Sequence, residues 1–356
     1  MDYLHSQQCV HLLRMSSSFG LSLCIYLVEM SHSTTTITFV KPDKTYLPGD
    51  TVNGQVTITN TKPLKTRSVF IKWIGYSKTS VGRNPVCQHN YVNGNKLAWV
   101  STNEKNEMPV GTHDYKFSFT LPKDSAPTFK RSNGKNEYKV MVEFDKPWWF
   151  NTIVEEEFRV TKEIEDIAKY RSSKGWHWKH TIPSGLIFTS GPIFIKTRLP
   201  YYAYQPGEAM NIKFDIANNS GTVIRGIKVR LIKETHWHAR HQPQLCQGFG
   251  KCHLGSSQRH YTWNQYETSP MHKIDLAPYS EGIFTVPFYI PAEIQTPSFE
   301  SGLMVHRYRI EPLVYFKDSP FYYFISLGIL IGENLDAKKN EKEQNALDVA
   351  PPPYTA

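Results

Sequence analysis

The feature that most constrains this chain is an internal duplication. Residues 46–60, YLPGDTVNGQVTITN, align without a gap on residues 204–218, YQPGEAMNIKFDIAN. Both segments contain a Pro-Gly turn signal followed by apolar residues at alternate positions, which is the period of a half-buried β-strand. Self-similarity at a wide separation indicates two related structural units in tandem.

The two units also end alike. Residues 115–142 and 282–314 each contain an alternating strand that runs into an apolar residue and a proline, then a loop with a phenylalanine, then a strand through a tyrosine. The matching pairs are Leu121 with Ile290, Phe129 with Phe299, and Tyr138 with Tyr308. Each half has the size and strand spacing of a β-sandwich, so the predicted fold class is all-β with two tandem sandwiches.

A chain of 356 residues accommodates two such domains. Helical periodicity is almost absent, and the best helix candidate is residues 163–171, near the middle of the chain. We expect a disordered N-terminal extension over 1–35, a first sandwich over 36–165, a linker over 166–185, a second sandwich over 186–332 and a short disordered C-terminal tail over 333–356.

The apolar run at residues 19–28 is about half of the roughly 20 residues that a transmembrane helix needs. With Arg14 upstream it could be the apolar core of a signal peptide, but Glu29 follows it and no small-residue cleavage site does. The alternative, which we favour, is a poorly ordered extension, since Met30 directly precedes the first strand-like segment.

Charge and cysteine content narrow the classes of partner. The net charge of +9 favours acidic partners, and because it is spread along the chain we rank acidic membrane-proximal segments above nucleic acid. The cysteines are too few and scattered for a disulfide framework, which predicts the reducing cytosol. They are Cys9, Cys24, Cys87, Cys246 and Cys252.

Three stretches resemble a known family. Residues 45–79 resemble the opening of an arrestin N-terminal domain, and residues 115–148, which end in Asp-Lys-Pro-Trp, are similar to its later strands. Residues 190–234 are similar to the opening of an arrestin C-terminal domain. The resemblance covers roughly residues 36–332. It implies two tandem arrestin-like, immunoglobulin-like β-sandwich domains.

The sequence ending NALDVAPPPYTA contains a Pro-Pro-x-Tyr motif, formed by Pro351, Pro352, Pro353 and Tyr354. Consecutive prolines favour a polyproline II segment, which docks into the aromatic grooves of WW domains. This motif makes the chain resemble the arrestin-domain-containing proteins, or alpha-arrestins. That resemblance implies a cytosolic adaptor that joins membrane cargo to a WW-domain HECT ubiquitin ligase, with recruitment to the plasma membrane and endosomes.

A second candidate site is a set of basic residues in both halves. Alternating basic residues on the wet face of a sheet serve solubility, but they could also bind acidic or phosphorylated cargo segments or anionic lipid through charge-assisted bonds. The residues are Lys62, Lys65, Arg67 and Lys72, with Arg225, Lys228 and Arg230 in the second half.

A third candidate is the stretch from residue 236 to 260, which is rich in histidine and cysteine. Its weak candidate metal ligands are His236, His238, Cys246 and Cys252. The ligand types suit zinc, and alternating His236 and His238 would share one face of a strand end, but no pair has the usual finger spacing. A solvated loop is the simpler prediction, so we expect no metal and no cofactor.

No catalytic motif is found: there is no phosphate-binding P-loop, no Gly-x-Ser-x-Gly and no His-Glu-x-x-His. We therefore expect a non-enzymatic adaptor. Three alternatives stay open. These are a structural trafficking subunit like the arrestin-like component of retromer, a signalling adaptor that reads phosphorylated receptors without a ligase, and a metal-dependent enzyme at the histidine- and cysteine-rich stretch.

Overall fold

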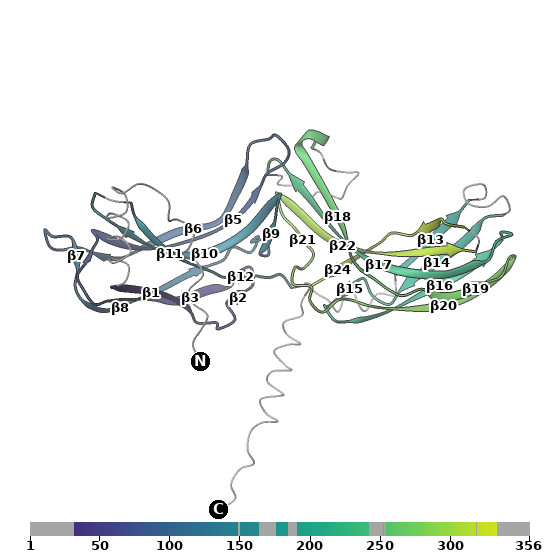
Figure 1. Ribbon diagram of the computed structural model, residues 1–356, viewed down its shortest axis with the longest axis horizontal. Coiled ribbons are helices and arrows are strands. Elements are labelled where there is room, and N and C mark those ends of the chain that lie inside the picture. Colours follow the sequence, from purple (N-terminus) through teal and green to yellow (C-terminus); the bar gives the residue numbers. More distant parts are fainter. Residues whose placement is uncertain are drawn as a thin grey trace, which may run out of the picture.

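The computed structural model describes residues 32–148, 150–163, 176–183, 191–241, 252, 254–317 and 319–332. They form two β-sandwich domains that lie side by side along the long axis of the molecule (Figure 1). The only helix in these ranges is a single 3-10 turn, η1, at Ser256–Gln258. Within the same ranges, no helix has the length and apolarity that crossing a bilayer requires. The predicted all-β tandem of sandwiches is confirmed.

In its described residues the first domain contains twelve strands. They are β1 (Ser33–Phe39), β2 (Thr45–Tyr46), β3 (Thr51–Asn60), β4 (Leu64–Lys65), β5 (Ser68–Thr79), β6 (Cys87–Val100), β7 (Glu107–Met108), β8 (Gly111–Thr120), β9 (Phe129–Arg131), β10 (Gly134–Asp145), β11 (Thr152–Glu157) and β12 (Arg159–Val160). One main sheet has the order β1-β3-β8, and the other has the order β11-β10-β5-β6 with β9 beside β10. The short pairs β2 with β12 and β4 with β7 complete the domain.

The second domain repeats this plan. Its strands are β13 (Trp176–Ile182), β14 (Ile193–Leu199), β15 (Ala203–Tyr204), β16 (Ala209–Asn218), β17 (Ile224–His238), β18 (Arg259–Thr268), β19 (His272–Leu276), β20 (Ser280–Tyr289), β21 (Phe299–Glu300), β22 (Met304–Phe316), β23 (Tyr322–Phe324) and β24 (Leu327–Ile331). One sheet has the order β13-β14-β16-β20 and the other has the order β15-β24-β22-β17-β18. The central strands correspond: β3 to β16, β5 to β17 and β10 to β22.

The duplicated sequence makes the same turn in both domains. Gly49 and Gly207 have φ of 92° and 83°, a region that glycine enters without steric cost. The acidic residue after each glycine accepts a hydrogen bond from the main-chain nitrogen three residues earlier. The bonds run from Leu47 to Asp50 at 3.0 Å and from Gln205 to Glu208 at 2.9 Å. The shared Pro-Gly-acid sequence therefore encodes one self-capped turn twice.

The asparagine that closes each repeat has one structural role. Asn60 and Asn218 are 2% and 0% exposed, and each side-chain amide donates to two turn carbonyls. A buried amide is stable only when its donors are satisfied, which explains why asparagine stands at both positions. The acceptors are Lys62 and Pro109 in the first domain, and Thr222 and Ala277 in the second.

Alternation along the strands builds the two cores. In β3, Val52, Val56 and Ile58 are fully buried while Thr51 and Asn53 face solvent. Burying an aliphatic side chain of this size stabilises the fold by about 1.5–3 kcal/mol. Each domain encloses its own apolar cluster in the same way.

The linker prediction needs correction. β13 lies inside the range 166–185 and pairs with β14 along all seven of its residues, from Trp176 with Leu199 to Ile182 with Ile193. It is therefore an edge strand of the second domain. Such a strand is held by pairing with a segment elsewhere in the chain, which local composition does not reveal. The helix predicted at 163–171 lies, apart from Glu163, outside the described residues, as does the apolar run at 19–28.

The domains meet at an apolar contact that we call the seam. Its buried residues are Val81, Ala126, Phe129, Trp237, Phe299, Leu303 and Met304. The ends of the β5–β6 and β17–β18 hairpins converge there (Figure 1). Thr79 Oγ1 donates to the main-chain oxygen of His238 at 2.7 Å, and Arg159 donates to the main-chain oxygen of Gln295 at 2.6 Å. The seam thus combines apolar burial with hydrogen bonds between the domains.

Candidate functional site

The Pro-Pro-x-Tyr motif formed by Pro351, Pro352, Pro353 and Tyr354 lies outside the described residues. It stays a prediction from the sequence.

The basic residues predicted in the first domain lie mostly beside carboxylates. The Lys72 ammonium lowers the pKa of Glu143, chiefly through their hydrogen bond. Lys62 and Lys65 also line a pocket of about 230 Å³ with Lys146. The nitrogen-to-oxygen distances are 3.7 Å for Lys65 with Glu107, 2.6 Å for Arg67 with Asp145, and 2.5 Å for Lys72 with Glu143. These cross-strand pairs support the sheet as well as adding charge to its surface.

In the second domain, Arg230 belongs to a buried charge network. Its Nε atom lies 2.6 Å from Glu311 Oε2, and Glu311 is 1% exposed. Arg309 Nε lies 2.8 Å from the other oxygen of Glu311, and Arg309 also pairs with Glu234. The network neutralises the charge of Arg230, whose side chain is 17% exposed, so this charge is not open to an acidic partner.

The other two predicted basic residues of the second domain are more accessible to an acidic partner. Lys228 lies over the ring of Tyr315, with its ammonium 5.7 Å from the ring centroid, and Arg225 is exposed. Within the described residues, neither has a carboxylate within 4.0 Å, and the same is true of Lys62 in the first domain. Binding of acidic cargo or lipid by the seven predicted residues stays a prediction.

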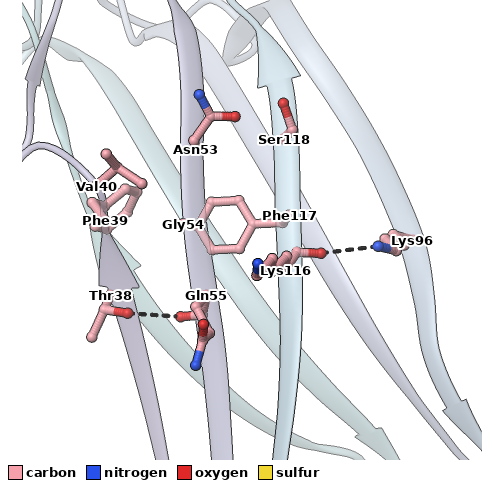
Figure 2. Close-up of a pocket in the computed structure, with 10 residues that line it drawn as sticks. All are labelled: Thr38, Phe39, Val40, Asn53, Gly54, Gln55, Lys96, Lys116, Phe117 and Ser118. Atoms are coloured by element: carbon pink, nitrogen blue, oxygen red, sulfur yellow. Dashed lines mark hydrogen bonds between the residues drawn. The ribbon is translucent and has the colours of Figure 1, made fainter.

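The first domain has an open cleft of about 620 Å³ beside β1 (Figure 2). Figure 2 shows the Phe117 ring over Gly54, where a Cβ would lie only 2.3 Å from that ring. Lys96 Nζ donates to the main-chain oxygen of Lys116 at 2.9 Å and so joins the edges of the two sheets. Neither lysine has a carboxylate partner within the described part of the chain. The cleft combines an apolar floor with two positive charges.

A second cleft, of about 360 Å³, opens at the seam. Lys130 and Arg131 of β9 and Lys233 of β17 line it, together with Arg159 and one carboxylate, that of Glu293. Burial, with a contribution from the charge of Arg131, lowers the pKa of Lys233. In the ranges that the structure describes, none of Lys130, Arg131 and Lys233 has a carboxylate within 4.0 Å. The cleft therefore favours an anion.

The sequence analysis missed the lysines and arginine of both clefts. Lys130 and Arg131 are neighbours on β9, but Lys96, Lys116 and Lys233 lie on three other strands, so the five residues form no common run or spacing pattern. Strand pairing and domain contact bring them together.

The histidine- and cysteine-rich stretch forms a cluster at the end of β17. His236 and His238 are 2% and 0% exposed, and together with Cys252 their ligand atoms lie within 4.8 Å of one another. Cys252 Sγ is 3.7 Å from His238 Nε2. The predicted shared face of the two histidines is confirmed, while Cys246 lies outside the described residues.

Burial determines the charge of these histidines. It lowers the pKa of His236 to about 4, and it lowers that of His238. Both imidazoles are thus neutral at pH 7, and a neutral imidazole nitrogen is a metal ligand or a hydrogen-bond acceptor. His241, just beyond β17, stacks instead on His89 of the first domain with centroids 4.2 Å apart.

Two sandwiches of matching topology, joined at an apolar seam, define the arrestin class of proteins. Residues 35–166 match the family described as Arrestin (or S-antigen), N-terminal domain. Residues 189–333 match Arrestin (or S-antigen), C-terminal domain. The chain belongs to the arrestin-domain-containing proteins.

Curated relatives carry the same family name. "Arrestin domain-containing protein 17" of Caenorhabditis elegans is 25% identical over 223 residues, which are 57% of this chain and 52% of that protein. "Arrestin domain-containing protein 1" of Mus musculus is 21% identical over 207 residues, 55% of this chain and 45% of that protein. The human protein of that name has the same identity and coverage. The match thus spans about half the length of these relatives.

Proposed function

We propose that this protein is a cytoplasmic trafficking adaptor that promotes ubiquitination, endocytosis and endosomal sorting of membrane proteins. Its arrestin domains bind the cytosolic segment of a receptor or transporter. Pro351, Pro352 and Tyr354 bind a WW domain of a HECT-type ubiquitin ligase. The adaptor works by holding cargo and ligase together at the plasma membrane and at endosomes, and no step requires catalysis by the chain itself.

The observation that carries this proposal is a combination: two arrestin domains are followed in the same chain by a Pro-Pro-x-Tyr motif. A polyproline II segment loses little conformational entropy on docking, and Tyr354 adds a flat ring with a polar tip. A single motif binds a single WW domain, so cargo bound to the same chain raises the effective concentration of ligase at the cargo.

The open cleft of the first domain supports the cargo half of the proposal. Its apolar floor and the unpaired charges of Lys96 and Lys116 suit an extended peptide with apolar and acidic residues. Phe39, which is partly buried against the core, and Val40, which is 73% exposed, both line it.

The test of the ligase half is co-purification of the full chain with a panel of WW domains. Tyr354→Ala is expected to abolish binding, because the tyrosine fills the groove beside the prolines. Pro353→Ala is the matched control, since it keeps Pro-Pro-x-Tyr intact and is expected to bind as the unchanged chain does. Equal recovery of WW domains with Tyr354→Ala would refute ligase recruitment through this motif.

A second candidate function is favoured by the cleft at the seam. Lys130, Arg131 and Lys233 present three cations to one cavity, as a reader of phosphorylated cargo requires. A signalling adaptor of this kind needs no ligase. Binding of a phosphorylated receptor-tail peptide, compared with its unphosphorylated form, separates the two functions. A Lys233→Met chain is expected to lose the phosphate preference if this candidate is correct.

A further inference from the structure

The cluster of His236, His238 and Cys252 has a composition that suits one class of ligand. Two imidazole nitrogens and one thiol sulfur are borderline to soft donors, which zinc binds and which magnesium and calcium do not. No carboxylate belongs to the cluster as the structure describes it.

The geometry of His238 resembles that of a metal ligand held by a neighbouring group. Its Nδ1 atom lies 3.2 Å from the main-chain oxygen of Gly302. A carbonyl oxygen only accepts hydrogen bonds, so Nδ1 carries the proton. Nε2 is therefore unprotonated and has a lone pair that can bind a metal. Nε2 faces Cys252 Sγ at 3.7 Å. Metal-binding histidines are commonly oriented by this kind of hydrogen bond from the other ring nitrogen.

The distances are close to those of a tetrahedral site. With zinc-to-sulfur and zinc-to-nitrogen bonds of about 2.3 and 2.05 Å, a nitrogen and a sulfur on one tetrahedron are about 3.6 Å apart. The observed separation between Cys252 Sγ and His238 Nε2 is 3.7 Å. All three donors lie within 4.8 Å of one another, so a shift of at most about 1.5 Å closes the site. Cys252 is partly exposed and lies four residues before η1.

We propose that His236, His238 and Cys252 bind one Zn²⁺ ion, which ties the end of β17 to the chain segment leading into β18, with water completing the coordination. Zinc binds all three side chains and replaces the thiol proton, which is released to solvent.

The position of the site indicates its role. The main-chain oxygen of His238 accepts the hydrogen bond from Thr79 of the first domain, and Trp237 lies between the two ligands in the apolar seam. A bound ion would hold these residues in place, so zinc stabilises the contact between the domains.

The test begins with the full, unmodified chain. Titration with Co²⁺, a spectroscopic substitute for Zn²⁺, is expected to give one equivalent of tetrahedral cobalt with a thiolate charge-transfer band, and Zn²⁺ is expected to displace it. Zn²⁺ is also expected to protect Cys252 from alkylation while leaving Cys87, the other described free cysteine, unprotected. Absence of cobalt binding, or equal alkylation of Cys252 with and without Zn²⁺, would overturn the proposal.

Variants then assign the ligands. Cys252→Ser is expected to lose the charge-transfer band and at least about 100-fold in zinc affinity, more than the loss of an orienting neighbour causes. Cys87→Ser, beside the seam, and His241→Gln, whose ring stacks on His89, are matched controls and are expected to bind as the unchanged chain does. Zn²⁺ should raise the unfolding temperature of the unchanged chain and of both controls, but not of Cys252→Ser. Unchanged binding by Cys252→Ser would place the metal elsewhere and refute this site.

Discussion

Phe129 and Phe299, which occupy equivalent positions in the two halves of the duplicated sequence, contact each other across the seam with ring centroids 5.6 Å apart. The loop before each phenylalanine is held by a tyrosine of the same half. The hydrogen bonds run from Tyr138 to the main-chain oxygen of Ala126 at 2.6 Å and from Tyr308 to that of Thr296 at 2.9 Å. The two domains thus meet through equivalent loops. The contact between them is formed by residues that the duplication repeats.

Because of this contact, we expect truncation of either ring to lower the free energy of unfolding substantially. Phe129 is 4% exposed and packs on Phe299, Trp237 and His306. Phe129→Ala should lower the free energy of unfolding by about 3–5 kcal/mol, because the cavity cannot fully collapse. Chemical denaturation followed by tryptophan fluorescence measures it. The control is Phe324→Ala, whose ring is 53% exposed; equal effects of the two changes would contradict the assigned role of the seam.

We also expect loss of the Glu311 carboxylate to lower the free energy of unfolding. Glu311→Gln removes the carboxylate that faces both Arg230 and Arg309, leaving two guanidinium groups without this partner in the sheet. The expected loss is about 3–5 kcal/mol, as for other broken buried pairs. Asp215→Asn is the control, since its pair with Lys196 at 3.8 Å is about 40% exposed and contributes at most about 1 kcal/mol. Urea denaturation of the two variants should separate them clearly.

We expect His306 to make the free energy of unfolding depend on pH. It is 2% exposed and hydrogen-bonded to Thr235, and burial, together with the charges of Arg131 and Lys233, lowers its pKa from 6.5 to about 3. Protonation is therefore easier in the unfolded chain. The contribution of neutral His306 to the free energy of unfolding is fully present above pH 6.5. It is lost progressively as the pH falls from 6.5 towards about 3.

The measurement is the free energy of unfolding as a function of pH for the unchanged chain and for His306→Gln. The unchanged chain should lose on the order of 2 kcal/mol more than the variant between pH 7.5 and pH 5. His236 and His238 titrate in the same direction in both chains, so the difference between the two curves isolates His306. Parallel curves would contradict the prediction.

The cleft beside β1 depends on a missing side chain. A Cβ at Gly54 would lie 2.3 Å from both the Phe117 ring and the main-chain oxygen of Thr38. Gly54→Ala should therefore destabilise the first domain by about 1–3 kcal/mol and disturb the pairing of β1 with β3. Gly328→Ala is the control, because nothing lies within 4 Å of a Cβ there. Hydrogen exchange of the β1 amides gives a local readout, and slow exchange in Gly54→Ala would show that the strand accommodates the change.

Much of the fold could be predicted from the sequence because its signals are local. The alternation of Val52, Val56 and Ile58, the Pro-Gly-acid turns and the closing asparagines each act within a few residues of the chain. Repetition of these signals was enough to predict two related sandwiches. The edge strand β13 escaped prediction because its structure depends on pairing with β14, and no repeat marks it.

The candidate sites, in contrast, depend on contacts between residues that are far apart in the sequence. The sequence by itself determined the all-β class, the duplication, the Pro-Pro-x-Tyr motif and the residue types available for binding. Only the tertiary structure decided which charges are neutralised, as in Arg230 with Glu311, and which stay open in a cleft, as in Lys233. It also brought Cys252 to His238 and Phe129 to Phe299. The physical reason is that solvation, charge pairing and metal geometry depend on distances between strands far apart in sequence, and these distances exist only once both sandwiches have formed and met.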